Sequence, residues 1–382
     1  MYPEPTIPNL SVDNALSLHC FPTEVRIALN CSLLRLNDEK GETRLSQIVR
    51  VPYEEMMNTS IKVLTLVGAP ENHATSVSKS LVQAQQSGHT SHGVMRLSDY
   101  VEFVQQGLII PKANPEIKSE RGAVINVEGN WGWGQVACKF SVELMAERVS
   151  KFGIASVAIN SCNHIGRLGE YVEMLAKKSF VSLMFCNTGP SVSAYGGRSR
   201  LFGTNPMAAA IPAEDGDIVI DFATAGTAEG KLRVALAAGE EIPSGLVITK
   251  DGKPTNDPSA FYEGGSLVPF GGHKGYCLSL LIELMSGSLS GVHPAMNSEY
   301  DHGNGTLLIA MDPDFFVGAE RFGADIAEAK MRIKQAPSVN PETPILLPGE
   351  LEANTQSQNR DAIEIPEKIW ETVRNLEKSL QN

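Results

Sequence analysis

The sequence lacks several features that mark large classes of protein. No apolar run approaches the roughly 18–20 residues of a membrane-spanning helix. The N-terminal stretch MYPEPTIPNLSVDN has neither a basic start nor an apolar run, so it does not resemble a secretion signal. Positive charge is scarce, because 32 lysines and arginines are set against 44 acidic residues and leave a formal net charge of −12. We therefore expect a cytoplasmic protein whose main partner is neither a membrane nor a nucleic acid.

Metal-binding and nucleotide-binding signatures are also missing. The six cysteines form no CxxC pair, so free thiols are expected rather than a zinc cage or a disulfide framework. Cys162 lies too near His164 in sequence for the usual nucleophile and base. A Rossmann GxGxxG loop is absent, since GNWGWGQ at 129–135 fails its spacing. GTAEGKL at 226–232 likewise lacks the spacing of a P-loop.

The order of apolar patterns predicts an α+β protein. Residues 1–50 show no clear period, and we predict a weakly structured extension there. The patterns predict helices at 51–68, 71–88, 97–107, 140–153 and 278–289, and strands at 154–160, 182–186, 207–211, 217–222 and 306–311. The chain turns helical again after Asp312. Because strands cluster between helical ends, we expect a helical domain from 51–125 plus 315–382, and a strand-rich domain at 126–314.

Two histidine motifs carry the chemistry that stands out. SHGVMR at 91–96 and CNHIGRLG at 162–169 each place an imidazole near an arginine, Arg96 or Arg167. Imidazole exchanges a proton near neutral pH, and guanidinium forms a planar fork that suits a carboxylate. Together they could hold a small carboxylic acid and move its proton. For a lone histidine, a structural role in a polar corner is the simpler interpretation. A hydrolase metal held by His89, His92 and His164 is a further alternative, although no HExxH helix accompanies it.

Glycine-rich loops follow later in the chain. In GGHKGYC at 271–277, Lys274 opens a long apolar helix, where an anion would meet free backbone N–H groups. A plain turn with a solvated lysine is the alternative. In LLPGELEA at 346–353, Gly349 and Glu350 stand at a predicted helix start, which fits an N-terminal cap equally well.

Taken together, these motifs resemble a known family. GHTSHGVMRL, NHIGRLGEY, GTNP, DFATAGTAEGK, PFGGHKGY, GNGTLLIAMDP and LLPGELEA occur in the order typical of the malate/L-lactate dehydrogenase family that lacks a Rossmann fold. This family includes ureidoglycolate and sulfolactate dehydrogenases, 2,3-diketogulonate reductase and a cyclic-imine reductase. The resemblance runs from about Val51 to the C-terminus. It implies a non-Rossmann cofactor domain at 126–314 with a central mixed or largely antiparallel sheet, and a homodimer.

The resemblance also implies roles for individual residues. His164 matches the proposed proton acceptor and His92 a proton donor, while Ser91 and Arg96 would line the substrate pocket. We prefer His164 for the main proton transfer because it follows a buried strand. Arg167 would be a second carboxylate ligand, or would pair with Glu170 or a neighbouring chain. The implied contacts to NAD or NADP are Thr188, Val219, Ile220, Asp221, Phe222, Ala223, Thr224, Ala225, His273, Lys274, Gly349 and Glu350.

The implied activity is hydride transfer between NAD or NADP and a small 2-hydroxy or 2-oxo acid. Three departures from the family pattern stand out: AQQSGHT precedes the first histidine motif, Ala225 replaces a serine, and Cys277 replaces a glycine. None removes an implied catalytic group. A cyclic-imine reductase and a catalytically inactive cofactor-binding homologue stay open as alternatives, as do the choice of acid and of NAD or NADP.

Overall fold

A computed structural model describes residues 47–381 of the chain. These residues belong to one compact unit. The extension predicted at 1–50 lies outside the described residues, apart from its last four positions. Of these, Ile48–Arg50 already belong to the first strand, β1. None of the helices within 47–381 is long and apolar enough to cross a membrane.

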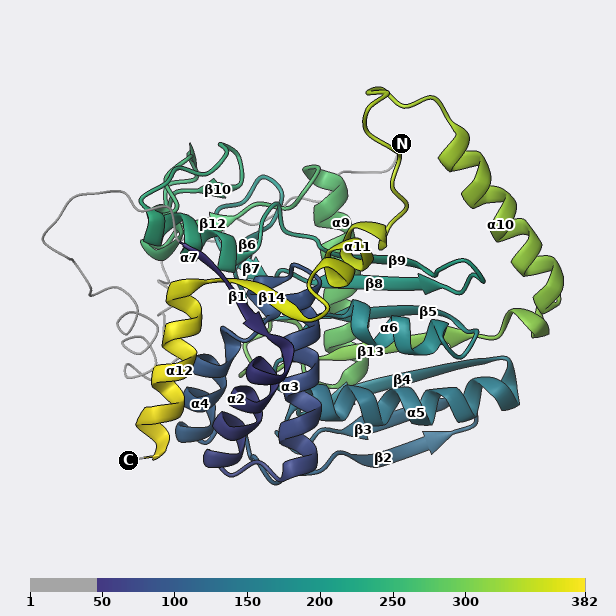
Figure 1. Ribbon diagram of the computed structural model, residues 1–382, viewed down its shortest axis with the longest axis horizontal. Helices are drawn as coiled ribbons and strands as arrows, with labels where there is room; N and C mark the ends of the chain where they lie inside the picture. The colour runs from purple at the N-terminus through teal and green to yellow at the C-terminus, as the bar shows by residue number, and fades with distance from the viewer. Residues whose placement is uncertain (1–46, 382) are drawn as a thin grey trace, which may run out of the picture. The chain divides into compact units, whose positions relative to one another are not determined.

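A seven-stranded sheet runs through the middle of the molecule (Figure 1). Its strands in spatial order are β2 (Glu116–Arg121), β3 (Val124–Glu128), β4 (Ile154–Asn160), β13 (Thr306–Met311), β5 (Val181–Cys186), β8 (Pro206–Ile211) and β9 (Ile218–Ala223). Only β3 and β4 pair in parallel, and every other neighbour is antiparallel. The sheet is therefore mixed and largely antiparallel, as the family resemblance implied.

Two helices bury their apolar sides against this sheet. They are α5 (Gly134–Phe152) and α6 (Gly169–Ala176), which pack on each other and on the strands. Val157, Met184 and Leu308 are fully or almost fully buried in the core between them. Strands β3 and β5 alternate buried and less buried positions, so their opposite face is left for other elements. The helix α9 (His273–Ile282) continues there into a π-helical turn, Glu283–Ser288, which contacts β5 and β13.

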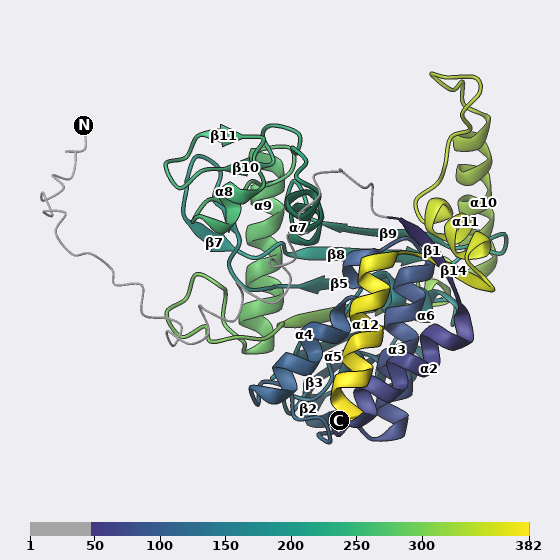
Figure 2. The same ribbon diagram turned by 60° about the vertical axis from the view of Figure 1, so that its left-hand side comes forward.

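A second core is built from helices near both ends of the described chain. It contains α2 (Tyr53–Leu66), α3 (Glu71–Gln86), α4 (Arg96–Gln105) and α12 (Glu367–Gln381). A two-stranded sheet joins these ends, because β1 (Ile48–Pro52) pairs antiparallel with β14 (Ala362–Pro366). The helix α12 packs on α2 and α4, and Figure 2 shows it beside α4, although its start lies 262 positions after the end of α4.

A small five-stranded sheet forms a third core. Its order is β11 (Pro254–Thr255), β10 (Val247–Ile248), β12 (Ser266–Leu267), β6 (Val192–Ser193) and β7 (Arg200–Phe202). Two helices, α7 (Glu229–Ala238) and α8 (Ser259–Tyr262), accompany this sheet. Leu232 and Phe261 from these helices pack with Val247 and Leu267 of the strands. Near the C-terminal end lie α10 (Ala319–Gln335), which extends away from the sheet in both views, and α11 (Glu350–Gln358).

The structure differs from the sequence prediction at several element boundaries. The helix expected at 140–153 begins at Gly134, and the one expected at 51–68 begins at Tyr53, after a strand. The helix expected at 278–289 begins at His273 and changes to π-helical geometry at Glu283. The sequence also missed β2 and β3. All six residues of β2 are exposed, so it carries no buried stripe to recognise. The predicted domain boundaries stay a prediction.

Candidate active site

The two histidine motifs meet in the folded chain. His92 ends a short 3₁₀ turn, Thr90–His92, between α3 and α4, whereas His164 lies in the loop between β4 and α6. Their rings stack with centroids 5.7 Å apart and planes inclined by 14°. Residues 72 positions apart in sequence thus form one site between the helical core and the sheet.

Each imidazole is held by a neighbouring hydroxyl. The Oγ of Ser91 lies 3.2 Å from Nδ1 of His92. The phenol oxygen of Tyr100, on α4, lies 2.8 Å from Nδ1 of His164. That phenol also accepts a 2.5 Å hydrogen bond from the amide of Gln135, at the start of α5. The sequence analysis did not single out Tyr100 or Gln135, and both are almost completely buried.

Arg96 lies beside the histidine pair with its guanidinium only partly engaged. Its Nε donates to the carbonyl of Ser91 at 2.7 Å, and its Nη1 donates to Asp99 at 2.7 Å. Asp99 is also 3.8 Å from Arg233 of α7, so an ion-pair chain links α4 to the small sheet's helix. The Nη2 group of Arg96 makes no hydrogen bond within residues 47–381 and can receive a carboxylate oxygen.

Burial and neighbouring charge keep both histidines neutral. Burial, with help from Arg96, lowers the pKa of His92 to about 3. Burial also lowers the pKa of His164 well below its usual value, and the charge of Arg96 adds to this. A neutral imidazole carries one N–H and one free lone pair. The pair can therefore both donate and accept hydrogen bonds at neutral pH.

The loop that carries His164 is fixed by its backbone surroundings. The side-chain amide of Asn163 donates to the carbonyls of Leu108, Trp131 and Gly132 at 3.0–3.1 Å. Gly134 packs directly on this loop, since an added Cβ would lie 2.5 Å from the carbonyl oxygen of His164. Gly134 therefore serves close backbone packing beside the site.

Arg167 does not form the ion pair with Glu170 that the sequence analysis considered. Its Nη2 donates to Glu173 at 2.6 Å, while Glu170 pairs with Lys139 at 2.9 Å. The reason is that α6 begins only at Gly169, so the spacing of three residues from Arg167 is not a helical one. Arg167 is itself buried.

The carboxylate of Asp221, an implied cofactor contact, forms a hydrogen bond with another residue of the protein. One oxygen accepts a 2.7 Å hydrogen bond from the backbone N–H of Gly169. Burial raises the pKa of Asp221 to about 6, against the opposing effect of Arg167. Its side chain ties β9 to the start of α6, next to the loop of His164.

The other implied cofactor residues fall into two groups. In the first, the N–H of Val219 donates to the Pro348 carbonyl at 3.1 Å. Gly349 packs against Val219 with a φ of +93°. Glu350 accepts from the N–H of Leu347 at 2.9 Å and pairs with Lys334. The start of β9 and the start of α11 are therefore adjacent.

The second group surrounds the far end of β9. The hydroxyl of Thr188 accepts from the N–H of Thr204 at 3.0 Å, and Thr224 donates to the Thr204 carbonyl at 3.1 Å. The N–H of Phe270 donates to the Thr224 carbonyl at 2.9 Å, just before the glycines that precede α9. Of the other implied residues, Ile220 and Ala223 lie within β9, and the ring of Phe222 meets that of Phe270 edge to face. Ala225 forms an isolated antiparallel β-bridge with Pro269. His273 and Lys274 are the first two residues of α9.

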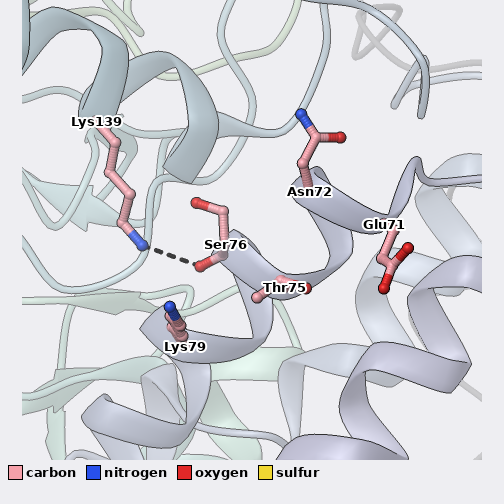
Figure 3. Close-up of a pocket in the computed structure, with 6 residues that line it drawn as sticks. All are labelled: Glu71, Asn72, Thr75, Ser76, Lys79 and Lys139. Atoms are coloured by element: carbon pink, nitrogen blue, oxygen red, sulfur yellow. Dashed lines mark hydrogen bonds between the residues drawn. The ribbon is translucent and has the colours of Figure 1, made fainter.

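A hollow of about 560 Å³, lined by residues with polar side chains, lies elsewhere on the surface (Figure 3). Glu71, Asn72, Thr75, Ser76 and Lys79 of α3 line it, together with Lys139 of α5, whose ammonium donates to the Ser76 carbonyl at 2.9 Å. It contains none of the candidate site residues. Within 47–381, no three His, Cys, Asp or Glu side chains gather as metal ligands, so His89, His92 and His164 form no such set.

Comparison with known proteins identifies the family. The chain matches the malate/L-lactate dehydrogenase family over residues 51–374 and belongs to that family. It is 34% identical to malate/(S)-sulfolactate dehydrogenase of Methanothermus fervidus, over 85% of this chain and 96% of that one. It is 36% identical to the Δ1-pyrroline-2-carboxylate/Δ1-piperideine-2-carboxylate reductase of Pseudomonas putida, over 72% and 83%.

The fold agrees with this assignment. Sulfolactate dehydrogenase from Methanocaldococcus jannaschii superposes with a TM-score of 0.79 at 33% identity, covering 87% of this chain and 98% of that one. The resemblance inferred from the ordered motifs is therefore confirmed, and so is the α+β fold class. The matched relatives are named as dehydrogenases or reductases, so the chain falls among oxidoreductases of hydroxy acids and related compounds.

Proposed function

We propose that the protein transfers a hydride between NAD or NADP and the second carbon of a small 2-oxo or 2-hydroxy acid. The observation that carries this proposal is the neutral, stacked pair His92 and His164 beside the half-engaged guanidinium of Arg96. The two imidazoles can bind and protonate or deprotonate the oxygen on the second carbon of such an acid, and the guanidinium can bind its carboxylate.

The roles of the residues follow from their contacts. Arg96, anchored by Ser91 and Asp99, holds the substrate carboxylate through its remaining Nη2 donor. His164 offers Nε2 to the reacting oxygen, since its Nδ1 is engaged by Tyr100. In oxidation the neutral ring takes the hydroxyl proton and becomes an imidazolium, and in reduction the imidazolium returns that proton to the new hydroxyl. His92, stacked on it, hydrogen-bonds the same oxygen. Positioned proton transfer of this kind commonly contributes about 10²–10⁴-fold to the rate.

The residues at the two ends of β9 fit a nicotinamide dinucleotide. The helix α9 begins at His273, directly after Gly272 with its φ of +65°, and no side chain caps its first N–H groups. Lys274 is exposed beside them, so this turn suits a phosphate. At the other group, Gly349 lets the turn before α11 lie close against Val219 at the start of β9. When bound, the cofactor supplies or accepts the hydride at its nicotinamide ring.

A cyclic-imine 2-carboxylate reductase is the second candidate. The identity of 36% to the Pseudomonas putida reductase favours it, and a C=N carbon presents the same carboxylate and hydrogen-bond acceptor to the site. We further propose that the protein works in the cytoplasm as a homodimer. The helix α10 supports association, because Lys330 is its only buried residue and its apolar Met331 and Ile333 are exposed.

The test is a reductase assay with both cofactors. Oxidation of NADH and of NADPH is followed by the loss of the near-ultraviolet absorbance of the reduced nicotinamide ring. The substrates tested are pyruvate, oxaloacetate, sulfopyruvate and Δ1-pyrroline-2-carboxylate. We expect turnover of at least one 2-oxo acid, and a loss of about 10²-fold or more in His164→Ala. Turnover of the imine alone would favour the second candidate. Cofactor binding with no turnover of any compound would mark an inactive homologue and refute the proposal.

A further inference from the structure

Behind His164 lies a buried hydrogen-bond chain, of which the reaction outlined above uses only the contact between Tyr100 and Nδ1. The amide of Gln135 donates to the phenol oxygen of Tyr100 at 2.5 Å, and that phenol lies 2.8 Å from Nδ1 of His164. Gln135 is fully buried and Tyr100 is 1% exposed, so water does not compete for these bonds. Each link connects a different helix or loop: α5, α4 and the loop after β4.

The number of hydrogens available sets the direction of this chain. A phenol has one O–H, and when its oxygen accepts from Gln135 that hydrogen is left for Nδ1 of His164. Nδ1 then acts as an acceptor. Because burial and Arg96 keep the pKa of His164 low, the ring is neutral and carries one N–H. That N–H must sit on Nε2, the nitrogen that makes no hydrogen bond within the described residues.

Reversing the hydrogen bond between Gln135 and Tyr100 would leave more of the Gln135 amide without hydrogen-bond partners. Its Oε1 is buried and has no partner among the described residues. If the amide were turned, Oε1 would accept from Tyr100, but the NH₂ group would then occupy the unpartnered position with two buried donors. Orphaned buried N–H groups are rarer in proteins than under-satisfied carbonyl oxygens. The observed orientation is therefore the more stable one.

We propose that Gln135 and Tyr100 are positioning residues that hold His164 as its Nε2–H tautomer, so that the resting protein presents an N–H to the reacting atom of the substrate. This inference rests on the proposed function and refines it. A 2-oxo acid or an imine offers only a lone pair there, and it matches an N–H donor. A 2-hydroxy acid that is to lose its proton needs a lone pair on Nε2 instead. The resting site is thus matched to the oxidised form of its substrate.

The tautomer can be measured without cofactor or substrate. Protein labelled with ¹⁵N-histidine is examined by NMR at pH 7.5, where the nitrogen shifts of a neutral ring distinguish a protonated from an unprotonated nitrogen. His164→Gln identifies the signal of His164 by its absence. We expect Nε2 to carry the proton in the wild type. In Tyr100→Phe and Gln135→Met, we expect this preference to be lost or reduced.

Tyr171→Phe is the matched control. Tyr171 is equally buried, but its hydroxyl donates to the carbonyl of Ile165 and not to an imidazole. This variant should keep the wild-type tautomer. A wild-type His164 with its proton on Nδ1 would overturn the proposal. So would an unchanged tautomer in both Tyr100→Phe and Gln135→Met.

Kinetics with an accepted substrate provide a second measurement. Tyr100→Phe should lower kcat for reduction about 10-fold, the equivalent of one buried hydrogen bond of roughly 1.4 kcal/mol, with KM changed by less than about 2-fold. Equal losses in Tyr100→Phe and Tyr171→Phe would indicate a merely structural role and count against the proposal. The failure of every substrate would refute the proposed function alone, because the tautomer is measured without one.

Discussion

The acid sensitivity of the fold should depend on His92. Burial and Arg96 lower the pKa of His92 to about 3, whereas an unfolded histidine has a pKa of about 6.5. Above pH 6.5 neither state binds a proton at this ring. As the pH falls below 6.5 the unfolded chain binds one and the folded chain does not, so stability is lost until the pH reaches about 3. At pH 5 the difference is 1.5 pH units, or about 2 kcal/mol.

His92→Gln isolates this contribution, because glutamine stays neutral at every pH. Urea denaturation at pH 8, 7, 6 and 5 gives the free energy of unfolding of each protein. Between pH 8 and pH 5, the wild type should lose about 2 kcal/mol more than the variant. Ser91→Ala is the control, since it removes the hydroxyl 3.2 Å from Nδ1 but keeps the imidazole. Parallel pH curves for the wild type and His92→Gln would refute the assignment of a buried, neutral His92.

Two further substitutions test the substrate cation and the turn before α11. Arg96→Lys should raise KM for a 2-oxo acid about 10–100-fold, with kcat less affected. The reason is that an ammonium group cannot bind Ser91, Asp99 and a substrate carboxylate in one plane as the guanidinium of Arg96 does. An unchanged KM would contradict the role of Arg96. Gly349→Ala should lower the free energy of unfolding by about 1–3 kcal/mol, seen as a lower Tm, since its φ is +93° and the new Cβ would lie 3.0 Å from that of Val219. Gly318→Ala, with a φ of +87° and no atom within 4 Å, measures the backbone strain alone, and an equal loss there would exclude a role for the contact with Val219.

Periodicity located those elements whose apolar residues repeat without interruption. The strand predicted at 306–311 has the observed bounds of β13, because its residues are mostly buried on both faces. The start of α5 was missed, since the glycines and tryptophans of GNWGWGQ hide the helical period that begins at Gly134. The pairing of β1 with β14 could not be predicted, because it joins segments whose contact no local pattern encodes.

In the candidate site, too, the sequence identified the residues that lie in local motifs and missed those that meet only through tertiary packing. The motifs around His92 and His164 are local, so the sequence could nominate both rings, and the structure brings them together. Tyr100 resembles one more apolar residue on a helix, next to Val101 and near Leu97. Its contact with His164 arises only from the packing of α4 against the loop after β4. Such partners are visible only once the tertiary structure is known.

The pairing of β1 with β14 has a consequence for how the protein is made. Arg50 donates to the carbonyl of Ala362, 312 positions later, so this sheet cannot form until most of the chain has been synthesised. The strands of the central sheet, β2 to β13, are all complete before β14 emerges from the ribosome. During synthesis, the sheet that carries His164 can therefore fold before the helical core that carries His92 is closed. Both imidazoles are synthesised early, whereas β14 and α12, which complete the helical core beside them, are synthesised last.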